Sequence, residues 1–170
     1  PSVCARSSLL IFRNLYILIY LCRLMAQVIT VDLKDRATRS ENIPEDWTEE
    51  KIDAAIERYE KFFRLAAKHS EKSIAPTLDI DEIWHLHMLS PVAYYRDCIS
   101  IMGKILDHDG GFGAVPEELS QLEETFVNTS KLWEEEYGTP YVEDPEAQLD
   151  EDMKKCWNNC VSRCHNACKS

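Results

Sequence analysis

Apolar residues recur at every third or fourth position through much of the chain, which is the spacing of one buried helix face. The clearest case lies between residues 47 and 69, where the apolar positions are Ile52, Ile56, Tyr59, Phe63 and Ala66. Asp46 is placed to cap this helix, and Glu49, three residues later, can complete a capping box. The pattern therefore predicts an amphipathic helix over about 47–69.

Two shorter helices are predicted next, in the segments LDIDEIWHLHML and PVAYYRDCISIMGKI. The first runs over about 78–89. Ser90 is the expected cap of the second, and Pro91 takes its first helical position, where proline is favoured. The second helix is expected to turn one apolar stripe to the core: Val92, Tyr95, Ile99 and Met102.

A fourth helix is predicted from Pro116 to a stop at Gly138, a position that glycine favours. Its expected buried residues are Leu119, Leu122, Phe126, Trp133 and Tyr137. The segment 107–113, DHDGGFG, predicts a turn before this helix. After the link TPYVEDPE, a fifth helix is predicted over about 145–168.

The fold class that follows is all-α, because no alternation longer than the short extended stretch VITVDL indicates a strand. We expect a compact bundle of four to five helices with a cysteine-rich C-terminal helix. The expected organisation is an apolar N-terminal extension over 1–24, a helical core domain over 25–144 and a cysteine-rich segment over 145–170.

Composition supports one folded domain and argues against one class of partner. The chain has 170 residues, of which 45% are hydrophobic and 29% charged, with only 5 Gly and 7 Pro, so disordered and collagen-like chains are excluded. The net charge of −11 leaves no general basic surface for a phosphate backbone. Nucleic acid is therefore not an expected partner.

The N-terminal extension differs in charge and composition from the rest of the chain. It carries three arginines and no acid, and its uninterrupted apolar run, Leu15–Cys22, is about half of the roughly 20 residues that span a bilayer. Membrane contact through residues 7–24 is one interpretation, although a signal sequence would need small residues at a cleavage point. The alternatives are a helix packed on the core and an extension ahead of a start at Met25, which we favour.

The predicted helix 78–89 carries the candidate site. Asp81 and His85 are four residues apart and so lie one turn above each other, and His108 can fold back toward them after the next helix. Carboxylate and imidazole donors suit Zn or Fe. His87 lies roughly 200° around the helix from His85, so it can join the same ion only if the helix is distorted.

A structural interpretation stands beside the metal site. Asp81 can orient the His85 imidazole by a hydrogen bond with no ion present, while Trp84 and Met88 fill core positions. Cys98 at a helical position is more typical of a small buried apolar residue than of a nucleophile. No catalytic residue is assigned.

The C-terminal segment MKKCWNNCVSRCHNACKS holds a second candidate site. Its four cysteines recur at intervals of four: Cys156, Cys160, Cys164 and Cys168. They can bind Zn or Cu with His165 as a further donor, form bridges to another helix or chain, or pack as small apolar residues. Because the total of 7 cysteines is odd, complete pairing within the chain is impossible, and a reducing, cytoplasmic setting is expected.

The run PTLDIDEIWHLHMLSPVAYYRDCISIMGKILDHDGGFG resembles the core motif of the glycine-rich domain-containing protein family, formerly a domain of unknown function, over roughly residues 40–140. The residues that carry the resemblance are Asp81, Trp84, His85, His87, Tyr94 or Tyr95, Asp97, Cys98 and His108. The resemblance implies no settled reaction. Plant members are linked to stress and hormone responses and often carry an RNA-binding segment and a glycine-rich tail, whereas the C-terminal segment here is cysteine-rich.

The leading hypothesis is an acidic, all-α, metal-binding or interaction module of this type, with an unidentified protein as a possible partner. Its site is the histidine-containing helical hairpin, with Zn or Fe as the expected metal, and the cysteine tail is a second, independent element. The alternatives are a small metal-dependent enzyme that uses the same residues and a purely structural helical domain.

Overall fold

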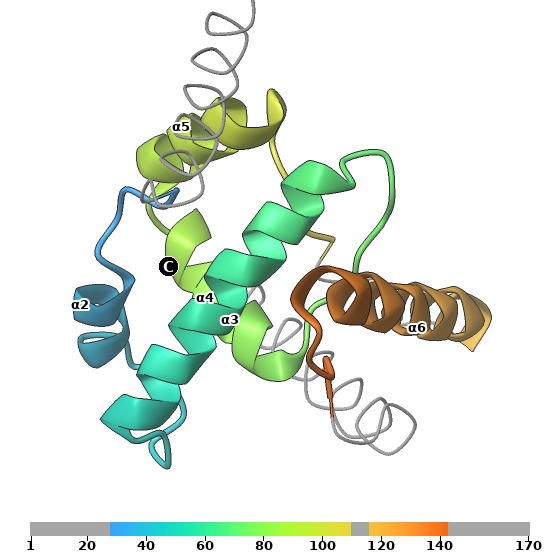
Figure 1. Ribbon diagram of the computed structural model, residues 1–170. Coiled ribbons are helices and arrows are strands. Elements are labelled where there is room, and N and C mark those ends of the chain that lie inside the picture. Colours follow the sequence, from blue (N-terminus) through green and yellow to red (C-terminus); the bar gives the residue numbers. More distant parts are fainter. Residues whose placement is uncertain (1–27, 110–115, 143–170) are drawn as a thin grey trace, which may run out of the picture.

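The computed structural model describes residues 28–109 and 116–142, and within them it has five helices and no strand (Figure 1). In chain order the helices are α2 (Leu33–Thr38), α3 (Glu49–Lys68), α4 (Leu78–Met88), α5 (Pro91–Met102) and α6 (Pro116–Tyr137). The predicted all-α class is confirmed. The short helix α2 was not predicted, because its six residues are too few to show a helical period.

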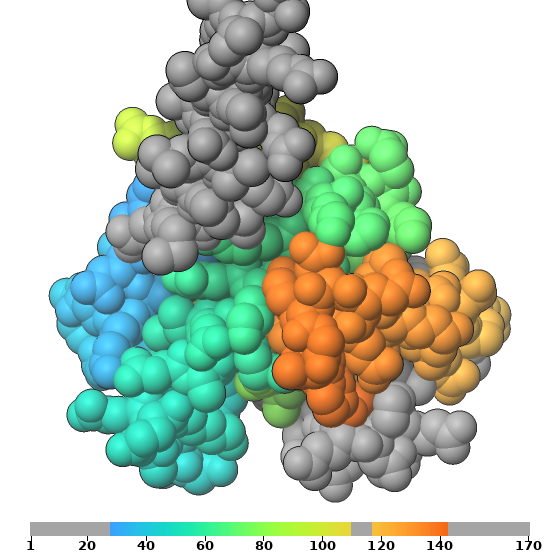
Figure 2. Space-filling view, viewed as in Figure 1, coloured from blue at the N-terminus to red at the C-terminus, as the bar shows by residue number. Residues whose placement is uncertain are grey.

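Helix α3 lies at the centre of the arrangement and contacts each of the other four helices (Figure 1). Its buried residues are Ile52, Ala55, Tyr59, Phe62, Phe63, Leu65 and Ala66. The predicted stripe is confirmed, except that Ile56 is half-buried. In the space-filling view, α3 lies between α2 on one side and α6 on the other (Figure 2).

The start of α3 differs from the prediction. Thr48, not Asp46, is the N-cap, and its side chain accepts a hydrogen bond from the Lys51 N–H at 3.3 Å. A turn directly before it, in which the Trp47 N–H donates to the Pro44 carbonyl at 3.0 Å, sets the first helical residue at Glu49. The capping box predicted from Asp46 and Glu49 is therefore wrong.

Helix α4 is buried on almost every side. Its buried residues are Ile80, Asp81, Glu82, Ile83, Trp84, Leu86 and His87. Such a helix lies inside the protein instead of on its surface, in agreement with its contacts to α2, α3 and α5. The polar members of this set must have partners, because a buried polar group without one is costly.

Helix α5 begins as predicted but presents a different face to the core. Ser90 is the N-cap residue and Pro91 is the first helical residue, although the Ser90 side chain makes no capping hydrogen bond. The buried residues are Tyr94, Asp97 and Cys98. The helix is turned this way because Asp97 reaches inward to hydrogen-bond partners, as described below.

The predicted stripe of α5 is accordingly not buried. Val92, Tyr95 and Ile99 are 62%, 54% and 40% exposed, and Met102 is half-buried. The spacing of these residues correctly predicts a helix, but it does not show which of the two apolar faces of α5 packs against the core. The predicted stripe is therefore a surface feature of α5.

Helix α6 begins and ends where it was predicted, with Gly138 at a φ of 65° directly after its last residue. Phe126 and Trp133 are buried, and the other predicted residues, Leu119, Leu122 and Tyr137, are half-buried. The following segment was predicted as a link, yet Tyr141 within it is buried. Its hydroxyl donates to the Ala75 carbonyl at 3.0 Å and accepts from the Thr77 N–H at 3.1 Å.

Several predictions fall outside the described residues. They concern the extension 1–24, most of the turn 107–113, the helix 145–168 and its cysteines. A search of the described residues for a helix long and apolar enough to cross a membrane finds none.

We expect Val92→Ser and Ile99→Ser each to change the free energy of unfolding by less than about 0.5 kcal/mol, because their side chains are exposed. Phe63→Ala, at a fully buried position of α3, should cost about 3–5 kcal/mol. Urea denaturation monitored by circular dichroism measures all three. A loss above about 1.5 kcal/mol at Val92 or Ile99 would show that this face is covered.

Candidate metal centre

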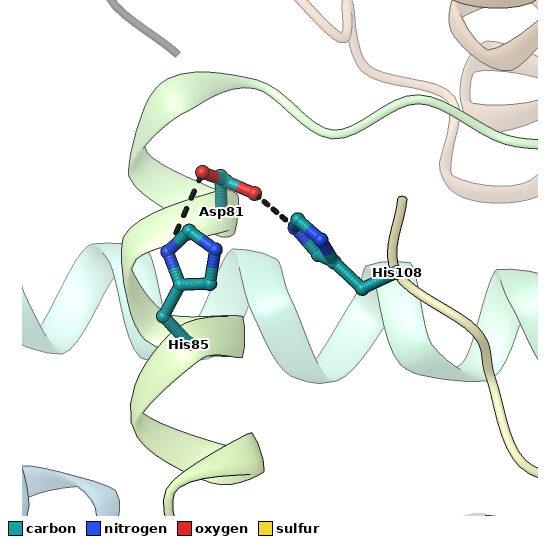
Figure 3. A group of neighbouring side chains, drawn as sticks. All are labelled: Asp81, His85 and His108. Carbon is teal, nitrogen blue, oxygen red and sulfur yellow. Dashed lines mark hydrogen bonds and ion pairs between the residues drawn. The ribbon is translucent and has the colours of Figure 1, made fainter. Parts of the chain in front are cut away.

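Two elements bring the three predicted ligands together (Figure 3). Asp81 and His85 lie one turn apart on α4, and His108 arrives from the irregular stretch that follows α5. The His108 Nε2 atom lies 2.7 Å from Asp81 Oδ1, and the His85 Nδ1 atom lies 3.6 Å from Asp81 Oδ2. One donor atom from each of the three residues lies within 4.8 Å of the others.

The three side chains differ in their access to solvent. Asp81 is 4% exposed, whereas His85 and His108 are 20% and 11% exposed. The two imidazole rings lie beside each other, with centroids 4.8 Å apart. The group therefore joins a buried carboxylate to two partly exposed imidazole side chains, and the His85 Nδ1 atom itself is buried.

Aromatic packing holds the His108 ring in place. The ring meets Trp84 of α4 edge to face, with centroids 4.5 Å apart and an interplanar angle of 69°. Trp84 is one residue before His85 and is itself buried. One short segment of α4 thus supplies two of the three donors and the surface against which the third donor residue packs.

Asp81 favours the protonated form of His108. Burial disfavours the imidazolium and is the largest single influence, but the hydrogen bond to Asp81, its negative charge and smaller contributions from the His108 main chain and Asp109 together outweigh burial. The pKa of His108 is therefore raised above its ordinary value of 6.5. Without a metal, the group is a carboxylate–imidazolium pair over a wider pH range than a free histidine would give.

The donor set fits a divalent transition metal. Zinc binds imidazole nitrogen and carboxylate oxygen at about 2.0–2.2 Å, so two donors of one tetrahedral ion lie about 3.4 Å apart. The separations of His108 Nε2 from Asp81 Oδ1 and of His85 Nδ1 from Asp81 Oδ2, 2.7 Å and 3.6 Å, each lie within an ångström of that value. Two histidines and one carboxylate are also the ligands of many non-haem Fe(II) sites.

His87, the other histidine of α4, is not brought into this group. Its Nδ1 atom lies 2.7 Å from the Tyr59 hydroxyl of α3, and its Nε2 atom lies 3.0 Å from Asp97 Oδ2 of α5. A neutral ring that donates from Nε2 and accepts at Nδ1 satisfies both contacts. Burial lowers the pKa of His87, against the opposing effect of Asp97, which favours this neutral form.

Asp97 connects this buried network to the start of the described chain. Its carboxylate accepts hydrogen bonds from the Thr30 N–H at 2.8 Å and from the Thr30 hydroxyl at 3.0 Å. Asp97 and His87 are both part of the predicted motif, but the sequence does not predict their hydrogen bonds to Thr30 and Tyr59. Tyr59 was expected only as a buried residue, and neither it nor Thr30 was predicted as a hydrogen-bond partner, because they lie 28 and 67 positions along the chain from His87 and Asp97.

A second polar cluster, centred on Arg58 of α3, was also missed. Its guanidinium donates to Asp79 Oδ2 at 2.6 Å, to the Thr77 hydroxyl at 3.1 Å and to the Tyr141 carbonyl at 3.1 Å. These bonds fix the beginning of α4 against α3. In the sequence, Arg58 is one of many charges on an amphipathic helix and carries no distinguishing signal.

The remaining candidate residues are cysteines. Cys98 is fully buried, and burial raises its pKa, as expected of an inert packed thiol. The tail cysteines Cys156, Cys160, Cys164 and Cys168 lie outside the described residues. The metal site predicted there stays a prediction.

Comparison with known proteins finds similarity to the family that the motif resembles. Residues 25–97 match the family described as "Glycine-rich domain-containing protein-like". Two curated proteins of Arabidopsis thaliana are similar to the chain. Glycine-rich domain-containing protein 1 is 36% identical over 99 residues, and glycine-rich domain-containing protein 2 is 35% identical over 94 residues. No solved structure matches significantly.

The extent of the match limits what it says about function. Each alignment covers 53% of this chain but only 11% or 12% of the curated relative, so the chain spans about a tenth of those proteins. The predicted resemblance is confirmed, but the family match ends at residue 97 instead of near 140. Asp81 and His85 lie inside it and His108 lies beyond it.

We expect Asp81→Asn to lower the pKa of His108, because the amide keeps an oxygen acceptor but removes the negative charge that favours the imidazolium. NMR titration of the metal-free protein measures this directly. The raised pKa also means that the pair stabilises the fold fully below pH 6.5 and loses this contribution as the pH rises through the folded pKa. An unchanged His108 titration in Asp81→Asn would contradict the assignment.

We expect Tyr59→Phe to lower the free energy of unfolding by about 1–3 kcal/mol, because it leaves the buried His87 Nδ1 without its donor. Tyr95→Phe is the matched control, since it removes the same hydroxyl from an exposed residue of α5 and should cost less than about 0.5 kcal/mol. Urea denaturation compares the two. Equal effects would contradict the buried hydrogen bond.

Proposed function

We propose that the helical domain is a metal-binding module that holds a divalent transition metal, Zn²⁺ or Fe²⁺, with Asp81, His85 and His108. The observation that carries the proposal is the convergence of three donor atoms within 4.8 Å from two separate stretches of chain. The ligands come from a buried helix and an adjacent loop, as in a site assembled by folding.

The competing interpretation is a hydrogen-bonded cluster without an ion. The His85 Nδ1 atom lies 3.6 Å from Asp81 Oδ2, which is the separation of an ion pair. Donors of one metal ion stand at about this separation. His87 is explained by hydrogen bonds alone, because both of its ring nitrogens make hydrogen-bond contacts and its side chain is fully buried.

Three protein ligands leave at least one coordination position for water or for a group from another molecule. This arrangement supports an interaction module whose partner completes the coordination shell, and it also supports the small metal-dependent enzyme considered above. The similar proteins' names give no reaction that would decide between them.

Metal binding is tested on the full chain with the four tail cysteines replaced by serine, so that thiol ligands do not contribute. We expect this parent to bind one Zn²⁺ or Co²⁺, measured by calorimetry and by the visible absorption of bound Co²⁺. His85→Ala and His108→Ala should each weaken binding by more than about 100-fold, a larger effect than the 10–100-fold typical of residues behind the ligands.

His69→Ala is the matched control, because it removes a histidine that is not part of the group. It should bind metal as the parent does. Incubation with Fe²⁺ under anaerobic conditions, followed by metal analysis, distinguishes an iron site from a zinc site. A parent that takes up neither metal, or that loses nothing on substitution of His85 and His108, would leave only the hydrogen-bonded cluster.

A further inference from the structure

His108, the third ligand of the proposed site, is held in place differently from Asp81 and His85. Asp81 and His85 are fixed by α4, whereas His108 follows α5 by six positions, in a stretch without regular structure. The chain leaves α5 through Gly103, whose φ of 72° reverses its direction. A ligand on such a stretch reaches the metal only if something else holds the stretch against α4.

A hydrogen-bonded pair of aromatic residues makes that connection. The Tyr94 hydroxyl of α5 donates to the main-chain carbonyl of Leu106, two residues before His108. The same hydroxyl oxygen accepts a hydrogen bond from Trp84 Nε1 of α4 at 2.9 Å. Both side chains are buried, so water does not compete freely for these bonds.

Trp84 connects this pair directly to the ligands. It precedes His85 on α4, and its ring packs against the ring of His108, with centroids 4.5 Å apart. One indole therefore supports the main chain before His108 through Tyr94 and supports the His108 ring by contact. Neither of the two hydrogen bonds of the Tyr94 hydroxyl involves a metal ligand. Together they nevertheless hold the main chain that positions His108.

We infer that Tyr94 and Trp84 are positioning residues for the proposed metal centre and act through the Leu106 carbonyl on His108. This inference rests on the proposed function. Residues that orient metal ligands typically contribute 10–100-fold to metal affinity without touching the ion. The tyrosine hydroxyl, not its ring, is the group to which we assign this role.

Tyr94→Phe tests the role, because it keeps the ring and removes only the hydroxyl. In the full chain with tail cysteines replaced, we expect Zn²⁺ or Co²⁺ affinity to fall 10–100-fold. Tyr95→Phe, the neighbouring exposed tyrosine, should leave affinity unchanged. Circular dichroism verifies that each variant is folded at the temperature of the titration.

A double substitution separates positioning from a general loss of stability. If Tyr94 acts through His108, Tyr94→Phe should change metal affinity by less than about 2-fold once His108→Ala is present. If Tyr94 supports the whole domain, the two losses should add. Full additivity, or a parent-like affinity in Tyr94→Phe, would overturn the inference while leaving the metal site intact.

A metal-free measurement distinguishes failure of the inference from failure of the proposed function. In the parent without metal, NMR should show nuclear Overhauser contacts between the His108 and Trp84 rings, and these should fall by more than half in Tyr94→Phe. Retained contacts would overturn the positioning role. A parent that binds no metal would overturn the proposed function and, with it, the assignment of Tyr94 to a metal centre.

Discussion

The orientation of α4 about its own axis depends on His87. Its two ring nitrogens contact Tyr59 of α3 and Asp97 of α5, so the helix is held from both sides. Because each residue turns an α-helix by about 100°, fixing one side chain fixes the direction of all the others. His85, roughly 200° further round, is thereby directed to the edge where His108 arrives. The orientation of α4 about its axis therefore determines both the buried hydrogen-bond network and the position of the candidate site.

This constraint explains why a largely buried helix carries so many polar residues. An apolar α4 could rotate or slide with little loss, since apolar contacts have no direction. Buried polar groups instead require particular partners, and a displaced helix would leave them unsatisfied. The cost of burying His87 and Asp97 is offset by hydrogen bonds that only one arrangement permits. We take this as the reason that polar residues occupy positions where leucine would pack.

The sequence predicted what depends on neighbours along the chain. Four helices were found from their spacing, and the i, i+4 pair Asp81 and His85 with His108 was recognised as a candidate group. What failed depends on three-dimensional placement: α5 has two faces, and Asp97, not the Val92 stripe, decides which face is buried. Tyr59 and Tyr141 were beyond prediction as partners because their bonds span 28 and more than 60 residues.

The unequal support of the three ligands has an energetic consequence. Two of the donors are on a helix that is rigidly held before any ion arrives, so binding orders little there. The third is on the stretch after Gly103, and any mobility of that stretch must be removed when the metal binds, at the expense of affinity. The contacts of Asp81 and Trp84 with His108 remove part of it in advance. At the proposed metal site, the contacts that hold the chain before His108 against α4 would therefore contribute to affinity in addition to the ligands themselves.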